Sequence, residues 1–180
     1  ALENVSFACR TGTVHALLGE NGAGKSTLMK ILSGAYQADS GEIHFMGQRY
    51  SHFSTRQALD LGIRIVYQEL NLLPMMSVAE NIFLGHEPRH RFGVIDQGKL
   101  RAATRALLER LGLALDPDQL VGELPVASQQ IVEIAKALSQ QADLIVMDEP
   151  SAILAGHELA NLFAIIRTLK REGVTIVYIS

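Results

Sequence analysis

Gly19-Glu20-Asn21-Gly22-Ala23-Gly24-Lys25-Ser26 is the stretch that decides the fold of this 180-residue chain. It fits the pattern G-x-x-x-x-G-K-[ST] without a mismatch, between an apolar strand pattern (Val14 to Leu18) and a helical pattern that stops at Gly34. Glycines let backbone N–H groups curl around phosphate oxygens at a helix N-terminus, where the helix dipole favours anions. The stretch therefore predicts a loop that binds nucleotide phosphates. The flanking strand and helix argue against the alternative, a plain glycine turn with a chance lysine.

The motif also assigns chemical roles. Lys25 is expected to reach the β- and γ-phosphates of ATP, and the Ser26 hydroxyl is expected to ligate Mg²⁺. ATP and Mg²⁺ are thus the predicted cofactors. The predicted ATP-binding residues are Gly19, Glu20, Asn21, Gly22, Ala23, Gly24, Lys25, Ser26 and Thr27.

Two adjacent carboxylates follow a second apolar run. Residues 144–147 read Leu-Ile-Val-Met and lead directly into Asp148 and Glu149. A parallel strand delivers such residues at its carboxyl edge, where α/β sheets bind ligands. We expect Asp148 to hold the Mg²⁺ shell and Glu149 to polarise the attacking water. The alternative is a solvated strand end that begins a turn at Pro150.

The order of elements predicts the fold class. Strand patterns lie near 2–7, 13–18, 42–46, 63–67, 143–148 and 174–179, and helical stripes lie at 25–33, 99–111, 128–139 and 157–172. The last stripe carries Leu159, Leu162, Phe163, Ile166 and Leu169. Residues 70–138 read as almost wholly helical. The prediction is an α/β P-loop NTPase with a RecA-like, mostly parallel sheet and an inserted helical subdomain. A single ATP-binding domain would span 1–180, with its core at about 1–69 and 140–180 and the helical subdomain at about 70–139.

Composition limits the classes of partner. No apolar run approaches the roughly 18 residues that span a bilayer, so any membrane role must come through a partner. The net charge is −3 and no run of Lys or Arg exceeds two residues, which argues against nucleic acid as a partner. The single cysteine, Cys9, fits a reducing cytoplasm.

The material between the two motifs resembles one family. Gln68 closes the strand pattern 63–67, and LPVASQQIVEIAKAL at 124–138 lies just before the acidic strand. This order resembles the ABC ATPases, in which a Walker A loop, a Q-loop, a signature, a Walker B strand and a D-loop follow one another. Their signature reads LSGGQ and leads into a helix of the type QQRVAIARAL. The chain looks most like the first ATPase half of tandem monosaccharide importers.

The resemblance implies a function and a setting. It implies ATP hydrolysis that powers sugar import, with Lys25, Gln68 and Glu149 as catalytic residues and Ser26, Gln68 and Asp148 as Mg²⁺ ligands. It implies a second ATPase half paired head to tail, integral membrane permease subunits and, indirectly, a sugar-binding protein, at the cytoplasmic face of the inner membrane. It also implies that the chain is a fragment, with an adenine-stacking aromatic before Ala1 and a switch histidine directly after Ser180.

Two other functions fit the phosphate-handling motifs. One is a soluble ABC ATPase that acts on nucleic acid or ribosomes, although no basic or coiled-coil insertion interrupts the helical region. The other is a nucleotide-binding regulatory module without hydrolysis. Intact Lys25, Asp148 and Glu149 count against this module, whereas the altered signature counts for it.

The signature departs from the family pattern at several positions. Pro125 stands where the signature serine is expected, Ser128 replaces the glutamine, and Ala155 stands where many relatives have the D-loop aspartate. Proline supplies neither a hydroxyl nor an N–H, so this signature is expected to serve the weaker of two ATP sites. The alternative is that the remaining N–H groups of the helix end suffice.

The loop after Gln68 is apolar. Its side chains at 72–76 include Leu72, Leu73, Met75 and Met76. They are expected either to cap the helical subdomain or to form a groove for a transmembrane partner, since methionines suit adaptable surfaces. The resemblance favours the groove, because this family docks its membrane subunit beside the Q-loop.

Overall fold

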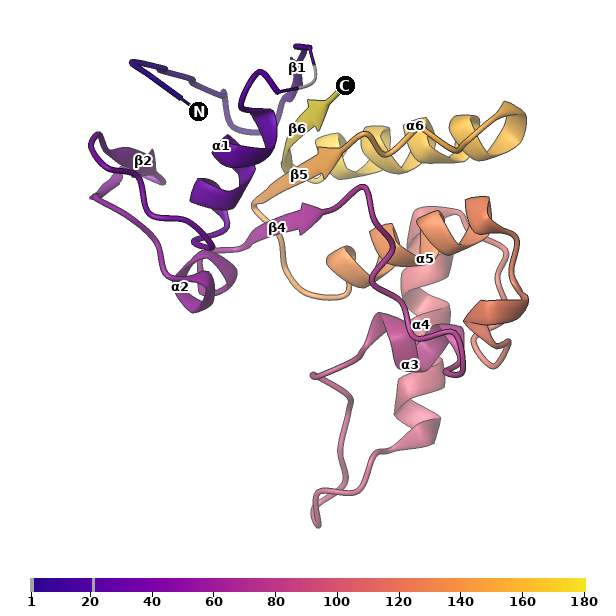
Figure 1. The fold of residues 1–180 in the computed structure, drawn as a ribbon. Coiled ribbons are helices and arrows are strands. Elements are labelled where there is room, and N and C mark those ends of the chain that lie inside the picture. The colour runs from indigo at the N-terminus through magenta and orange to yellow at the C-terminus, as the bar shows by residue number, and fades with distance from the viewer. Residues whose placement is uncertain (1, 21) are drawn as a thin grey trace. The chain divides into compact units, whose positions relative to one another are not determined.

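The computed structural model describes residues 2–20 and 22–180, and the chain divides into two compact units (Figure 1). The first unit comprises the chain up to Tyr67, Ala142–Glu149 and Lys170–Ser180. The second comprises Gln68–Gln141 and Pro150–Leu169. The first unit holds all the named strands of the described chain, and the second is helical.

A parallel sheet forms the centre of the first unit, as predicted. In spatial order its strands are β1 (Val14–Leu17), β6 (Thr175–Ile179), β5 (Leu144–Asp148) and β4 (Ile63–Val66). All three neighbouring pairs run parallel. A separate antiparallel hairpin joins β2 (Ile43–Phe45) to β3 (Gln48–Tyr50). Because parallel strands end at one edge, the residues that follow β1 and β5 emerge on the same side of the sheet.

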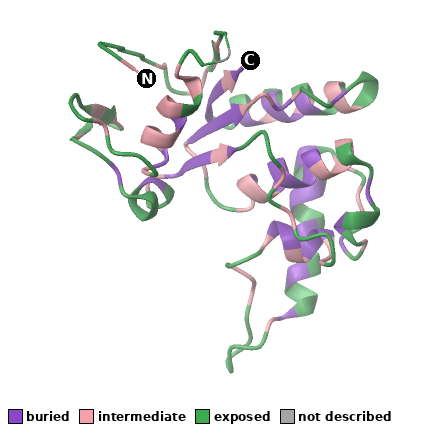
Figure 2. Ribbon diagram, viewed as in Figure 1, coloured by how far each residue is buried: buried purple, intermediate pink, exposed green. Residues whose placement is uncertain are grey.

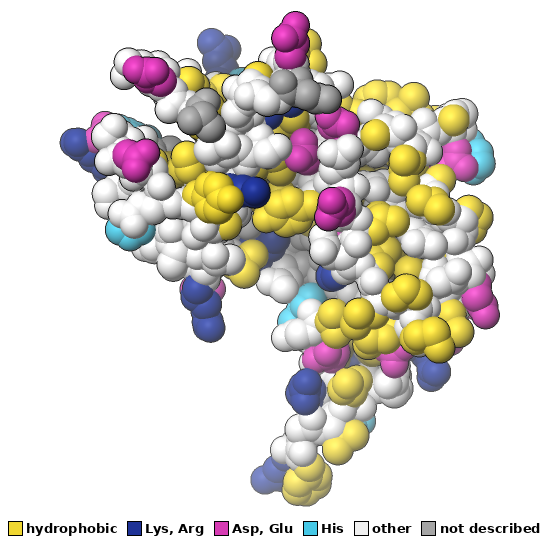
Figure 3. All heavy atoms as spheres, in the orientation of Figure 1, with side chains coloured by type: hydrophobic (Ala, Val, Ile, Leu, Met, Phe, Trp, Pro, Cys, Tyr) yellow, Lys and Arg dark blue, Asp and Glu magenta, His cyan; other side chains and the backbone are white. Residues whose placement is uncertain are grey.

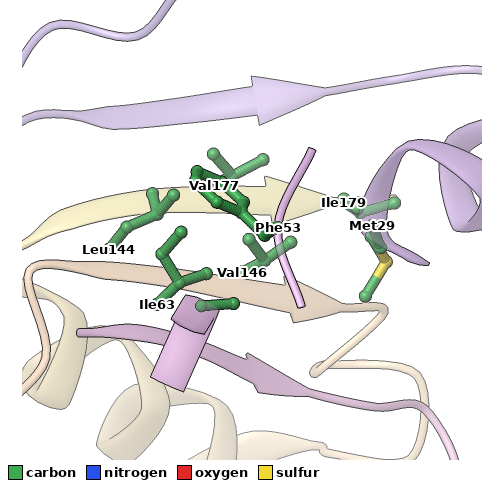
Figure 4. Close-up of a cluster of buried hydrophobic side chains, with 8 residues drawn as sticks. Met29, Phe53, Ile63, Leu144, Val146, Val177 and Ile179 are labelled. Carbon is green, nitrogen blue, oxygen red and sulfur yellow. The ribbon is translucent and has the colours of Figure 1, made fainter. Parts of the chain in front are cut away.

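One face of the sheet carries a hydrophobic core (Figure 4). Side chains that alternate along the strands point to this face, because successive strand residues face opposite ways. Helices α1 (Lys25–Leu32) and α2 (Thr55–Asp60) supply Met29 and Ala58 to the core. The buried set is Met29, Phe53, Ala58, Ile63, Leu144, Val146, Val177 and Ile179. This packing anchors α1 directly behind the phosphate loop.

The second unit consists of helices with conventional ends. They are α3 (Val78–Ile82), α4 (Gln97–Leu111), the short 3-10 helix η1 (Val121–Glu123), α5 (Val126–Leu138) and most of α6 (Gly156–Arg171). Ser77 and Glu80 form a reciprocal capping box at the start of α3, and Asp96 accepts from the Lys99 N–H at the start of α4. The chain leaves α4 at Gly112, whose φ is 70°.

Three sequence-based expectations were wrong. Residues 2–7 form no strand, and Asn4 has the left-handed φ of 53°. Residues 70–138 are far from wholly helical, because a long, largely exposed connection separates α3 from α4 (Figure 2). Phe163 was expected on the apolar face of its helix, but it is 42% exposed, while Ile165 is fully buried. No helix within 2–20 and 22–180 has the length and apolar character to cross a membrane.

Candidate nucleotide-binding site

The phosphate loop owes its shape to glycine. Gly22 has a φ of 86°, and Gly24, directly before α1, has a φ of 95°. Only glycine adopts this left-handed backbone without steric cost. A Cβ on Gly19 would lie 3.3 Å from the Ala23 Cβ, so a side chain there would crowd the loop. Asn21, one of the predicted ATP-binding residues, lies outside the described residues.

The amino end of α1 is bare. Among residues 2–20 and 22–180, no side chain caps it, and its first turn contains no acidic residue. By contrast, Ser54, Ser77 and Asp96 accept backbone N–H groups at the starts of α2, α3 and α4. The first N–H groups of a helix have no partner within the helix, and the helix dipole adds positive potential there. The start of α1 is therefore equipped to receive an anion.

Lys25 lies across the loop that precedes it. Its ammonium group donates to the Gly19 carbonyl oxygen and, at 3.3 Å, to the Glu20 carbonyl oxygen. The side chain is half-buried, as is Thr27, whereas Ser26 is exposed. The loop thus holds the Lys25 ammonium close to its own backbone, and this cation adds to the positive potential at the start of α1.

The sheet register brings the acidic pair to the same edge. Leu17 of β1 and Asp148 of β5 both pair with Ile179 of β6, so the three residues form one row across the sheet. Neighbouring strands lie about 4.8 Å apart, which places Asp148 about 10 Å from Leu17, two residues before Gly19. The Glu149 N–H continues the ladder by donating to the Ile179 carbonyl at 3.0 Å. The structure therefore places the predicted phosphate loop and acidic pair together in one unit.

The electrostatics of this edge couple the three charged groups. Burial raises the pKa of Asp148, the adjacent Glu149 carboxylate raises that pKa further, and the Lys25 ammonium opposes both. Two adjacent carboxylates in a half-buried setting favour a bound cation, because a cation removes their mutual repulsion.

Glu149 has a backbone that its sequence does not reveal. Its φ is 46°, in the left-handed region that non-glycine residues seldom adopt. Such conformations cluster at functional sites, where the surrounding structure holds them. Strand β5 ends at Asp148, and the chain bends at Glu149.

The remaining predicted residues lie in the second unit. Gln68 is its first residue and is exposed, and its catalytic and metal-binding roles stay predictions. Pro125 is the N-cap of α5, which, like α1, begins without a side-chain cap. The side-chain amide of Gln129 donates back to the Leu124 carbonyl at 2.9 Å. The signature stretch thus leads into a helix whose amino end is also bare.

Comparison with known proteins agrees with this geometry. The sequence model of the family described as "ABC transporter" matches residues 2–152. The chain is 54% identical over its whole length to a ribose/galactose/methyl galactoside import ATP-binding protein of Agrobacterium fabrum, of which it covers 35%. It is 55% identical over its whole length to the ribose import ATP-binding protein RbsA 1 of Rubrobacter xylanophilus, of which it covers 36%. The chain therefore spans about a third of the length of these relatives.

Solved structures give the same answer for the fold. A nucleotide-free ATP-binding cassette from an ABC transporter superposes with a TM-score of 0.87 at 28% identity, over 99% of this chain and 74% of that one. A cassette in its ADP conformation superposes with a TM-score of 0.82 at 30% identity, over 98% of this chain and 73% of that one. The predicted α/β P-loop NTPase fold and the family resemblance are confirmed. The chain belongs to the ABC transporter family, and its fold is that of the family's ATP-binding cassettes.

Proposed function

We propose that this chain binds and hydrolyses ATP as a single domain over 1–180, with a helical subdomain at about 70–139, and that hydrolysis powers sugar import through separate membrane subunits. One observation carries the proposal. The bare amino end of α1, with Lys25 in its first turn, shares one sheet edge with Asp148 and Glu149. The names of the relatives, which import ribose, galactose and methyl galactoside, support a monosaccharide as the cargo.

The phosphate loop acts in binding. The backbone N–H groups at the start of α1 and the Lys25 ammonium donate to phosphate oxygens, and Gly22 and Gly24 allow the close backbone approach. The described members of the predicted set lie in the loop before this helix end or in the first turn of α1, as Lys25, Ser26 and Thr27 do.

Oxygen donors at the same edge fit Mg²⁺. The Asp148 carboxylate and the exposed Ser26 hydroxyl are the hard ligands that this ion prefers, and Gln68 is proposed to complete the set. The raised pKa of Asp148 supports the fit, because a divalent cation would stabilise the charged form that burial and Glu149 disfavour. When bound, Mg²⁺ would neutralise charge on the transferring phosphoryl group.

Glu149 serves hydrolysis rather than binding. Its carboxylate orients a water molecule for attack on the γ-phosphorus and accepts a hydrogen bond from it. Asp148 precedes it at the strand end, so metal binding and water activation are divided between neighbours. The left-handed backbone at Glu149, where the chain bends after β5, supports this separate role.

The apolar segment 72–76 is the proposed docking site for a permease helix. Leu73 is 46% exposed and Met75 is 85% exposed, whereas Met76 is only half-exposed. Hydrophobic side chains gather on the surface of the helical unit in this view (Figure 3). An apolar contact of this kind would place the chain at the cytoplasmic face of the inner membrane, bound through its partner.

A second ATPase half is the other proposed partner. The bare start of α5 supports it, because the signature helix would offer its N–H groups to a phosphate held by the opposite phosphate loop. In the assembled transporter, each ATP would then lie between one half's Walker A loop and the other half's signature. A sugar-binding protein would deliver the cargo to the permease.

The test uses the full-length protein reconstituted with its permease in vesicles. Glu149→Gln keeps the shape of the side chain and removes its charge, so ATP binding should persist while hydrolysis and ribose or galactose uptake collapse. Glu109→Gln, an exposed carboxylate on α4, is the matched control and should behave as the wild type. Near-normal hydrolysis in the Glu149→Gln protein would remove Glu149 from its role, and ATP turnover with no ATP-dependent sugar uptake would refute the transport function.

A further inference from the structure

The apolar segment 72–76 is paired, main chain to main chain, with the stretch that leads into the signature. The Pro74 carbonyl accepts from the Gly122 N–H at 2.9 Å, and the Met76 carbonyl accepts from the Val121 N–H at 3.0 Å. An antiparallel bridge pairs Ser77 with Leu120. This pairing ends two residues before Leu124, where the signature begins.

Gly122 makes the approach possible. A Cβ at this position would lie 3.0 Å from the Pro74 carbonyl oxygen and 3.1 Å from the Pro74 Cβ. Glycine lets the two segments approach closely here, because a side chain at 122 would force Pro74 to shift by a few tenths of an ångström.

The other end of the segment is fixed to α5 itself. The Glu133 carboxylate accepts from the Asn71 N–H at 3.2 Å, and the Lys136 ammonium donates to the Asn71 carbonyl at 2.6 Å. Glu133 and Lys136 are three residues apart and so share one face of the helix. Glu133 is 7% exposed, in a helix whose other buried side chains are mostly apolar. A buried carboxylate is costly unless it is hydrogen-bonded, and here the Asn71 N–H supplies such a bond.

Asn81 fixes the middle of the segment. This fully buried residue accepts from the Leu73 N–H at 2.7 Å. Its amide group donates to the carbonyl oxygens of Leu73, Met76 and Ser77 at 3.0, 3.2 and 3.0 Å. The segment is thus attached at its start, its middle and its end, all within the second unit. The Asn71 side-chain amide also donates to the Glu69 carbonyl at 3.1 Å, so the attached stretch extends back to Glu69.

We infer that Glu133 and Lys136 are positioning residues, which fix the apolar segment to the signature helix so that the segment, residues 119–122 and α5 move together. A partner helix that pushes on the segment then displaces Leu124 and Pro125 directly. This inference rests on the proposed function for the identity of the partner helix. The attachment of the segment to α5 does not depend on it.

The experiment uses the full-length protein reconstituted with its permease. Glu133→Ala removes the acceptor for the Asn71 N–H, Glu133→Gln keeps a neutral acceptor of the same shape, and Lys136→Met removes the other contact. Glu109→Ala, on the exposed face of α4, is the matched control. Hydrogen exchange over residues 70–77 reports the attachment, and sugar transported per ATP hydrolysed reports coupling.

For Glu133→Ala and Lys136→Met we expect exchange over 71–76 to become about tenfold faster, and transport per ATP to fall about tenfold, as loss of a charge-assisted hydrogen bond predicts. The KM for ATP should not change. Glu133→Gln should restore most of the coupling, which general loss of structure would not allow. If Glu133→Ala fails to fold, Lys136→Met alone decides the matter.

Crosslinking separates failure of this inference from failure of the proposed function. A Leu73→Cys protein that never captures a permease subunit refutes the docking site. If capture is normal but exchange and coupling in Glu133→Ala and Lys136→Met match the control, the positioning role is refuted. Faster exchange with unchanged coupling would also overturn the inference, because the attachment would then carry no displacement.

Discussion

Replacement of Lys25 by alanine is the most direct test of the phosphate loop. The Lys25 ammonium donates to two carbonyl oxygens of its own loop, so it is held close to the loop backbone at the start of α1 rather than free in solvent. A phosphate group at this helix end would exchange those carbonyl contacts for stronger charge-assisted ones. Lys25→Ala removes them without changing the backbone of a helix that tolerates alanine well.

The magnitude follows from the contacts. A hydrogen bond to a charged group contributes about 1.5–3 kcal/mol, and about 1.4 kcal/mol corresponds to a tenfold change in Kd. ATP should therefore bind at least about tenfold, and up to about a hundredfold, more weakly. The neighbouring carboxylates should weaken ATP binding further in the Lys25→Ala protein. Lys25 opposes the raised pKa of Asp148, so removal of Lys25 leaves the negative charge of Asp148 and Glu149 less compensated.

The assay must measure ATP binding at this site alone, because the full-length protein is expected to contain two ATP sites. Photoaffinity labelling with an azido-ATP, with the label assigned to peptides of this chain, gives the affinity at this loop. Lys30→Ala is the matched control. Lys30 lies in the last turn of the same helix, with its ammonium 5.0 Å from the centroid of the Tyr36 ring. It should bind ATP as the wild type does.

Unchanged labelling affinity in a folded Lys25→Ala protein would refute the reasoning. Equal losses in the Lys25→Ala and Lys30→Ala proteins would refute it too, because they would indicate damage to α1 rather than a lost phosphate contact.

Three further predictions concern the second unit. Leu73→Asp or Met75→Asp should abolish transport while ATP labelling stays normal; loss of labelling would show that the segment serves folding instead. Pro125→Ser supplies an N-cap hydroxyl to α5, so it should raise the thermal midpoint, as a cap worth about 1 kcal/mol does, and should change the ATPase rate less than Lys25→Ala does. A rate that changes more than in Lys25→Ala would contradict the view that this signature serves the weaker site. Burial raises the pKa of Glu133 above its unfolded value, so the free energy of unfolding should fall as pH rises through the raised pKa. Glu133→Gln removes this pH dependence, so the thermal midpoint of the variant should rise relative to that of the wild type as pH increases above the unfolded pKa of Glu133, and equal slopes would contradict the shift.

The phosphate loop and the acidic strand were predictable because their signals are local. A glycine-rich motif between a strand and a helix specifies its own geometry, and an apolar run that ends in Asp148 and Glu149 specifies a strand end. The sequence did not predict that Leu17, Ile179 and Asp148 are paired in one row across the sheet. The register between distant strands depends on packing rather than on either segment alone.

The misses have physical causes. Residues 4–7 alternate polar and apolar side chains as a strand does, but alternation alone supplies no partner for the backbone. The pairing of Pro74 and Met76 with residues 121 and 122 joins two irregular segments, which no periodicity marks. Glu133 carried no clear signal, because its helical neighbours Gln129, Gln130 and Lys136 are also polar, and its partner Asn71 could be found only from the fold.

The left-handed backbone of Glu149 bears on how this protein responds to selection. Forcing a residue with a Cβ into that conformation costs roughly 1–2 kcal/mol, and glycine would avoid most of the cost. A library sorted only for foldedness or heat resistance would therefore enrich glycine at this position. On the proposed role of Glu149, glutamate persists there only where the organism depends on ATP turnover. On that proposal, the residue at position 149 distinguishes a gene under selection for catalysis from one retained merely as a folded scaffold.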